Sequence, residues 1–265
     1  MNSRAPIGLV YGGGGPLATA VGMGAAQALA AGGLVISDLP ALGTSGGSVA
    51  AAAARADIPY DDVVQALRGV RLPERRPGYM RAMATELFGD RHDPLLWTSV
   101  VRLSTGRRTR LCGADHPVAA IVAASCAVPF LVAPERIGAH RYIDGGARSW
   151  VSADLAPTAD HLIVIAPVVA PSFGRFGSVL SGHLSWELRR WRRRTGGRTT
   201  VIRVVDDLAS RVKRWADLFN PALAADARAH ARAVVTDALA PDGRLHDLLS
   251  TRTAAPPDEE NTQCL

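Results

Sequence analysis

The spacing of apolar residues predicts strands that alternate with helices along the chain. Short runs rich in Val, Ile and Leu that end near glycine or polar residues are typical of buried strands. Such runs occupy residues 6–11, 35–45, 141–146, 161–169 and 199–209, and residues 98–113 form a predicted hairpin. Alanine-rich or amphipathic segments predict helices over 16–33, 46–56, 61–70, 116–129 and 221–240. This alternation predicts an α/β protein with three layers, α/β/α, around a mostly parallel central sheet.

The pattern loosens in two places. Residues 71–98 mix proline, glycine, arginine and large apolar side chains, so both a lid or insertion and an ordinary connecting segment stay open. Residues 251–265 are polar, with two prolines and three acidic residues, and we expect a disordered tail there. We therefore expect one domain over residues 1–250.

Composition narrows the class of protein but not its chemistry. Hydrophobic residues make up 48% and charged residues 20%, which is ordinary for a globular protein. The net charge is +6, and 29 of the 30 basic residues are arginine, which with the abundant Ala and Gly indicates a GC-rich bacterial genome. A charge of this size is compatible with anionic membranes, acidic substrates or nucleic acid.

The three cysteines, Cys112, Cys126 and Cys264, give neither a disulfide framework nor a CxxC metal site, so a reducing cytoplasm is the simplest expectation and no metal is expected. The first apolar run is too short for a signal peptide, and no run of about 18 apolar residues predicts a transmembrane helix.

Residues 43–47, Gly-Thr-Ser-Gly-Gly, match the G-x-S-x-G nucleophile elbow. In such an elbow a serine occupies a sharp strand-to-helix turn, where side chains two residues to either side would collide, so Gly43 and Gly47 are needed. Gly46 is the remaining glycine of the motif. The helix that follows directs its N-terminal N–H groups at the site, which favours an anionic intermediate. A plain turn in a Gly-rich chain is the alternative.

A serine nucleophile needs a base, and none of the seven histidines has an acidic residue placed to orient it. Asp144 is the better candidate. It ends a predicted strand and precedes Gly145 and Gly146, a tight turn that holds a carboxylate at the edge of the sheet where α/β proteins bind ligands. An ordinary Asp-Gly turn is the simpler alternative.

Four glycines, Gly12 to Gly15, join the first strand to the first helix. Their amides can line an oxyanion hole or hold a phosphate. The pattern Gly13-x-Gly15-x-x-Ala18 also satisfies the loose dinucleotide fingerprint, for which Asp38 would have to hold the ribose. A nucleotide-binding protein is therefore an open alternative.

Taken in order, GGGG at 12–15, GTSGG at 43–47 and DGG at 144–146 resemble the patatin-like phospholipase family, and "VAASCAVPFLVAP" before "RYIDGGARS" strengthens the resemblance. The resemblance covers residues 7–170 well. It implies a patatin-like fold and a serine esterase of lipid metabolism that cleaves (lyso)phospholipids or related lipid esters without a cofactor. It also implies Ser45 as nucleophile, Asp144 as base and Gly13, Gly14 and Gly15 as oxyanion hole.

The sequence departs from the family at Leu17 and Ala18, where the family commonly has a basic residue and glycine. The departure leaves the backbone donors in place but removes a charge near the oxyanion or the lipid headgroup. A patatin-like lipid-binding module with weak catalysis is a further alternative.

The run Ser185–Arg198 holds six arginines and two tryptophans. A solvated helix face is the simplest interpretation, and peripheral contact of Arg189–Arg194 with an anionic membrane is the functional one. Nucleic acid, the third possibility, is not expected. The expected location is thus the cytoplasm, with contact at the membrane.

Overall fold

The computed structural model describes residues 5–170, 172, 174–203, 211–212 and 214–246. Eight strands form one sheet in the order β5-β6-β3-β2-β1-β7-β8, and β4 pairs with β3 outside this path. The strands are β1 (Ala5–Tyr11), β2 (Ala41–Thr44), β3 (Asp93–Arg102), β4 (Arg107–Gly113), β5 (Glu135–Ile137), β6 (His140–Asp144), β7 (Ala159–Ala166) and β8 (Arg198–Arg203). The helices are α1 (Gly15–Ala31), α2 (Gly46–Arg55), α3 (Tyr60–Arg68), α4 (Tyr79–Phe88), α5 (Val118–Ser125), α6 (Gly174–Thr195) and α8 (Pro221–Leu239).

The centre of the sheet is parallel. Strand β1 pairs in parallel with β2 and β7, β2 with β3, and β7 with β8, whereas β4, β5 and β6 add antiparallel pairs at one side. Parallel strands end at the same edge, so the segments that follow β1 and β2 meet there. The predicted α/β class with a mostly parallel sheet is confirmed.

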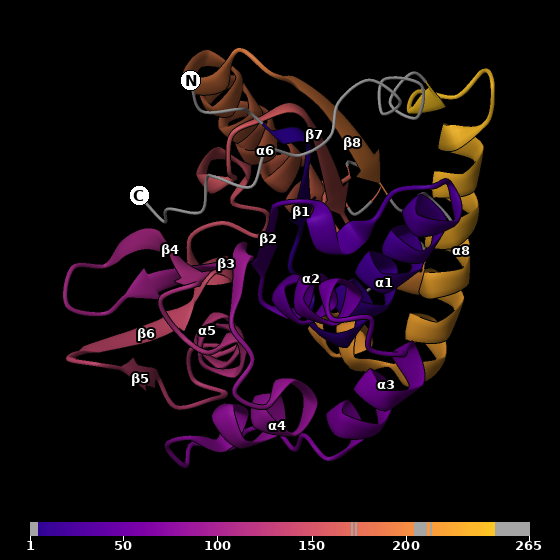
Figure 1. Cartoon of the computed structure of the whole chain (residues 1–265). Coiled ribbons are helices and arrows are strands. Elements are labelled where there is room, and N and C mark those ends of the chain that lie inside the picture. Colours follow the sequence, from indigo (N-terminus) through magenta and orange to yellow (C-terminus); the bar gives the residue numbers. More distant parts are fainter. Residues whose placement is uncertain (1–4, 171, 173, 204–210, 213, 247–265) are drawn as a thin grey trace.

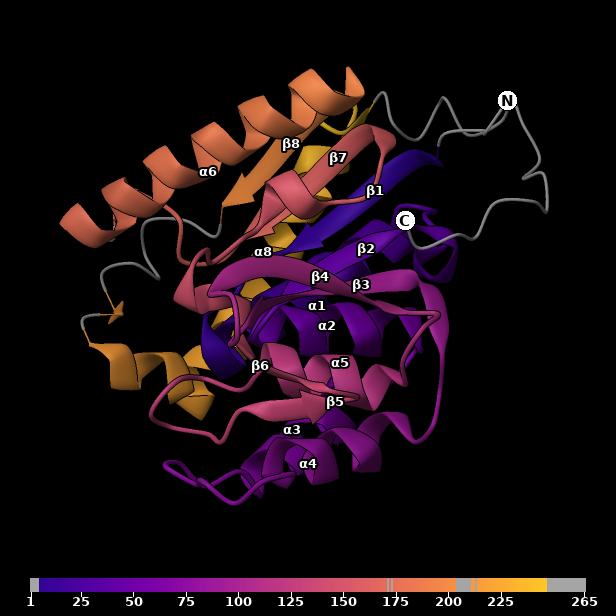
Figure 2. The same cartoon turned by 90° about the vertical axis from the view of Figure 1, so that its left-hand side faces the viewer.

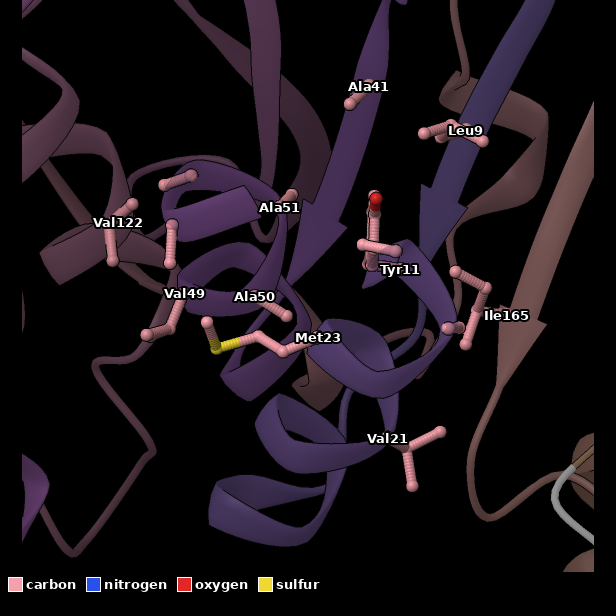
Figure 3. Close-up of a cluster of buried hydrophobic side chains, with 14 of the residues drawn as sticks. Leu9, Tyr11, Val21, Met23, Ala41, Val49, Ala50, Ala51, Val122 and Ile165 are labelled. Atoms are coloured by element: carbon pink, nitrogen blue, oxygen red, sulfur yellow. The ribbon is translucent and has the colours of Figure 1, made fainter. Parts of the chain in front are cut away.

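Helices cover both faces of this sheet. In Figures 1 and 2, α6 lies over β7 and β8 on one face, and α1, α2, α5 and α8 lie on the other. Successive side chains of a strand point to opposite faces. Accordingly Val10 packs in the smaller apolar cluster with Leu188 and Trp191 of α6, while Leu9 and Tyr11 pack in the larger cluster with α1 and α2 (Figure 3). Three layers result.

Several boundaries differ from the sequence prediction. The strand predicted over 35–45 is wrong at its start, because a 3₁₀ turn, η1 (Ile36–Asp38), precedes the four-residue β2. Residues 71–98 contain α4 and the first residues of β3, so part of the predicted lid or insertion belongs to the central sheet. Cys112 is disulfide-bonded, which the cysteine spacing did not predict. The predicted tail, 251–265, lies outside the described residues.

Tyr11 is fully buried beneath α1 and α2, and its hydroxyl has no hydrogen-bond partner among the described residues. An unsatisfied buried hydroxyl costs about 1–3 kcal/mol. We therefore expect Tyr11→Phe to raise the free energy of unfolding by about 1 kcal/mol, measured by urea denaturation. The matched variant Tyr79→Phe should lower it, because the Tyr79 hydroxyl accepts from the Arg71 amide at 2.6 Å and donates to the Gly69 carbonyl. Equal effects of the two variants would contradict this account.

Candidate active site

Ser45 lies at the sharp turn between β2 and α2, with φ 53° and ψ −129°. A non-glycine residue adopts this conformation only where its surroundings enforce it. Two serine hydroxyls do so. The Ser45 amide donates to the Ser125 hydroxyl at 2.9 Å, and the Ser48 hydroxyl donates to the Ser45 carbonyl at 2.6 Å. The Ser45 backbone is thus held on both sides.

The glycines after Ser45 permit two helices to meet at the turn. A Cβ at Gly46 would overlap the carbonyl oxygen of Gly15, and one at Gly47 would overlap that of Tyr11. The Thr19 hydroxyl of α1 donates to the Gly46 carbonyl at 2.9 Å. The N-termini of α1 and α2 therefore lie together beside Ser45, and both add positive potential there.

Strand β3 brings Ser45 and Asp144 together, although they are far apart in the sequence. Thr44, just before the turn, pairs with Ser99 of β3, and Asp144 at the end of β6 pairs with the next residue of β3, Val100. The two side chains therefore lie at the same level, at the ends of the two strands that flank β3. The Ser45 side chain and the Asp144 carboxylate interact directly, and this interaction lowers the pKa of Asp144.

The Asp144 carboxylate is buried, with 3% of the residue exposed. Burial, opposed by the hydrogen bonds from the Ser45 hydroxyl and the Gly146 amide, raises its pKa to about 6. The Gly146 amide donates to Oδ1 at 2.7 Å, and a Cβ at Gly145 would overlap Ser99. The turn after β6 therefore fixes the carboxylate, and its raised pKa makes it a stronger base than an exposed aspartate.

The glycine loop offers amides of two kinds. Gly12 donates to the Ile165 carbonyl at 2.8 Å and Gly13 to the Trp150 carbonyl at 2.6 Å, so both hold the loop in place. Gly14 has φ 142° and Gly15 φ 59°, conformations that other residues rarely adopt. Within the described residues, the amides of Gly14, Gly15 and Gly46 donate to no protein acceptor. These three amides are therefore available to a ligand, whereas the Gly13 amide is not.

Ser45 and Asp144 line a cavity of about 730 Å³. This is the size of a pocket for a small ligand with a hydrocarbon portion. Most of its wall is apolar, contributed by α2, α3, α4 and the segment after α5. The apolar residues are Pro16, Val49, Leu67, Val70, Leu72, Met80, Met83, Val128, Pro129, Leu131, Val132, Ala147, Trp150, Ala216 and Phe219. Leu17 and Ala18, the departures from the family pattern, are buried outside it.

Sequence reasoning missed Ser125 and the apolar wall. Ser125 lies within an alanine-rich helix, where nothing local distinguishes it from a core serine. Its hydroxyl accepts from the Ser45 amide and donates to the Ser99 carbonyl at 2.8 Å, so it joins the turn to β3. Only the tertiary structure shows this role.

The other sequence candidates lie away from the cavity. No histidine lines it in the described part of the chain. Asp38 precedes β2, whereas the glycine loop follows β1, and because these strands are parallel the two lie at opposite edges of the sheet. The arrangement that the dinucleotide fingerprint requires is therefore contradicted.

The arginine run, for which a solvated face and a membrane contact were both open, lies in α6 and just beyond it. Arg192 donates to the Thr199 hydroxyl, Arg194 to the carbonyls of Asp154 and Ala156, and Arg190 stacks on Trp186. Arg189 and Arg193 are exposed. The helix covers the face of the sheet opposite α1 and α2 (Figure 2).

No family model matches the sequence, and no curated protein matches it. Among solved structures, the crystal structure of VipD from Legionella pneumophila is similar to this chain, with a TM-score of 0.45 and 13% sequence identity. The similarity covers 94% of this chain and 67% of that chain. A likeness of this degree assigns no functional residue. No helix in the described part of the chain is long and apolar enough to span a membrane.

Proposed function

We propose that this protein is a patatin-like serine esterase that cleaves carboxylic ester bonds of (lyso)phospholipids or related lipids. One observation carries the proposal: the Ser45 side chain and the buried Asp144 carboxylate interact at the wall of one largely apolar cavity. A serine, a base within hydrogen-bond reach and unpaired amides beside them are the parts that acyl transfer requires.

In the first half-reaction, Asp144 takes the hydroxyl proton of Ser45 as the Ser45 Oγ attacks the ester carbonyl carbon. The carbonyl oxygen becomes an oxyanion, which the amides of Gly14, Gly15 and Gly46 bind with the support of the helix dipoles. The oxyanion then reforms the carbonyl and expels the alcohol, which receives its proton from Asp144. An acyl-serine results.

In the second half-reaction, Asp144 takes a proton from water as the water oxygen attacks the acyl carbon. The same amides bind the second oxyanion. Its collapse breaks the bond to Ser45 Oγ, the proton on Asp144 returns to that oxygen, and the carboxylic acid leaves. No step needs a metal or a cofactor.

The apolar wall supports a long acyl chain as the substrate group. Each buried methylene stabilises a bound acyl chain by about 0.8 kcal/mol, and the chain stays bound in the transition state. We therefore expect kcat/KM to rise about fourfold per added methylene until the cavity is filled. A lipid-binding module without turnover would use the same cavity, and only measurement of hydrolysis separates the two functions.

We expect Met83→Trp, which fills part of the cavity, to lower kcat/KM for long-chain p-nitrophenyl esters roughly 10²-fold and to leave the acetyl ester nearly unchanged. The acetyl ester checks that the catalytic groups are intact, and Val179→Trp, at an exposed position of α6, is the control. Absence of ester hydrolysis by the wild type would overturn the proposed function. Equal losses of kcat/KM for short-chain and long-chain esters would mean that the acyl chain does not bind beside Met83.

A further inference from the structure

A bulky apolar side chain projects from the surface beside the cavity. Phe130 is 85% exposed, more than any other large apolar residue that the structure describes. Its backbone has φ 68°, which is rare for a bulky residue and costs free energy. Neither exposure of the ring nor this backbone conformation helps the chain to fold.

Contacts from the segment Arg71–Arg76 hold Phe130 in this position. Arg75 Nε donates to the Phe130 carbonyl at 3.1 Å, and the Glu74 amide donates to the Leu131 carbonyl at 2.8 Å. The backbone that carries the exposed ring is therefore held in place. We call the surface formed by Phe130 and the segment Arg71–Arg76 the rim.

The rim is positively charged. Arg71, Arg75 and Arg76 are exposed, and the one carboxylate of the segment, Glu74, is paired with Arg76 at 3.0 Å. Exposed arginines around an aromatic side chain fit an interface with anionic headgroups, where the ring enters the acyl boundary and the guanidinium groups meet phosphates.

The rim adjoins the wall of the cavity. Leu72, Leu131 and Val132, next to the exposed rim residues, line the apolar wall. A bilayer in contact with the rim would therefore lie beside the wall that receives an acyl chain. Helix α6, which carries the arginine run, lies on the opposite face of the sheet from α3 and α4 (Figure 2).

We propose that the rim, Phe130 with Arg71, Arg75 and Arg76, docks the protein on an anionic lipid bilayer. This inference extends the proposed function, because it supplies the surface from which a lipid would enter the cavity. The bilayer is favoured over a protein partner because the rim combines one projecting aromatic ring with clustered arginines.

The test is sedimentation with sucrose-loaded vesicles, using Ser45→Ala as the background so that no lipid is cleaved. We expect binding to phosphatidylcholine vesicles that contain phosphatidylglycerol, weakened by added salt, and much weaker binding to phosphatidylcholine alone. Arg71→Ala with Arg76→Ala should weaken binding about 30-fold, since each arginine near an anionic surface contributes roughly fivefold. Both substitutions leave the Arg75 contact to Phe130 intact.

Two further variants make the result specific to the rim. Phe130→Asn suits the left-handed backbone, removes the ring and should weaken binding about tenfold. Arg189→Ala with Arg193→Ala removes the same charge from α6 and should have little effect. Equal loss in the α6 variant, or no vesicle binding by the background protein, would overturn the proposal.

Hydrolysis of a short, water-soluble ester separates this proposal from the proposed function. In protein that retains Ser45, the rim substitutions should leave the hydrolysis of this ester unchanged. Loss of vesicle binding with intact ester hydrolysis would support the rim as the docking surface. Vesicle binding without any ester hydrolysis would contradict the proposed function and leave the docking surface supported.

Discussion

Replacing Ser45 by alanine is expected to lower kcat/KM for an ester by about 10⁴- to 10⁶-fold, because the acyl-enzyme can no longer form. The amides of Gly14, Gly15 and Gly46 would remain and leave slight residual catalysis. Steady-state hydrolysis of a p-nitrophenyl ester, with enzyme concentration raised for the variant, measures the loss.

The fold should survive this change. Alanine keeps the Cβ, and the Ser45 amide still donates to the Ser125 hydroxyl, so the turn keeps its support. Thermal unfolding should shift by no more than a few degrees. Ser185→Ala, on the exposed face of α6, removes a hydroxyl of the same kind and should retain full activity. A Ser45→Ala variant with undiminished turnover would exclude Ser45 as the nucleophile.

Replacing Asp144 by asparagine is expected to lower kcat/KM by about 10³- to 10⁴-fold. The amide can still accept the Ser45 hydrogen bond through its oxygen, but it cannot take the proton. In the wild type, Asp144 must be ionised to act as base. Because its pKa is about 6, kcat/KM should fall as pH is lowered through 6, and this fall should be absent from the residual activity of the variant.

The same substitution should stabilise the protein at neutral pH. Burial raises the pKa of Asp144 from 3.8 to about 6, so the folded state binds the proton more tightly than the unfolded state. Ionisation of Asp144 therefore lowers the free energy of unfolding as pH rises from 4 to 6. Above pH 6 the loss is roughly 3 kcal/mol. Asp144→Asn should unfold at a higher temperature than the wild type at pH 7.5, and the difference should vanish near pH 4.

Asp237→Asn, an exposed change on α8, is the control and should alter neither activity nor the pH dependence of stability. Activity lost together with stability in Asp144→Asn would indicate a structural role for the carboxylate. Activity retained by Asp144→Asn would mean that another group is the base.

The sequence predicted much of this candidate site because its parts are local motifs. Glycines mark the loop after β1 and the turn at Ser45, and the Asp-Gly-Gly sequence marks the turn after β6. The elements that carry them were also predicted, since their apolar periodicity is strong. The assignment of catalytic roles stays a prediction until activity is measured.

The sequence could not predict contacts that depend on pairing between distant segments. Strand β3 places Ser45 and Asp144 at one level, yet its first residues were grouped with the loosely patterned stretch 71–98. The hydrogen bond from the Gly13 amide to the Trp150 carbonyl joins segments far apart in the chain. It engages the Gly13 amide, whereas the amides of Gly14 and Gly15 have no protein acceptor among the described residues. Short-range patterns carry no information on such contacts.

The central claim is that Asp144, and no histidine, activates Ser45. The most direct measurement is the rate of fluorophosphonate labelling as a function of pH, with the modified residue located by peptide mass spectrometry. The account predicts an adduct on Ser45, a half-maximal rate near pH 6 and a labelling rate reduced at least 10²-fold in Asp144→Asn. An adduct on another residue, or equal labelling of Asp144→Asn and wild type, would contradict it.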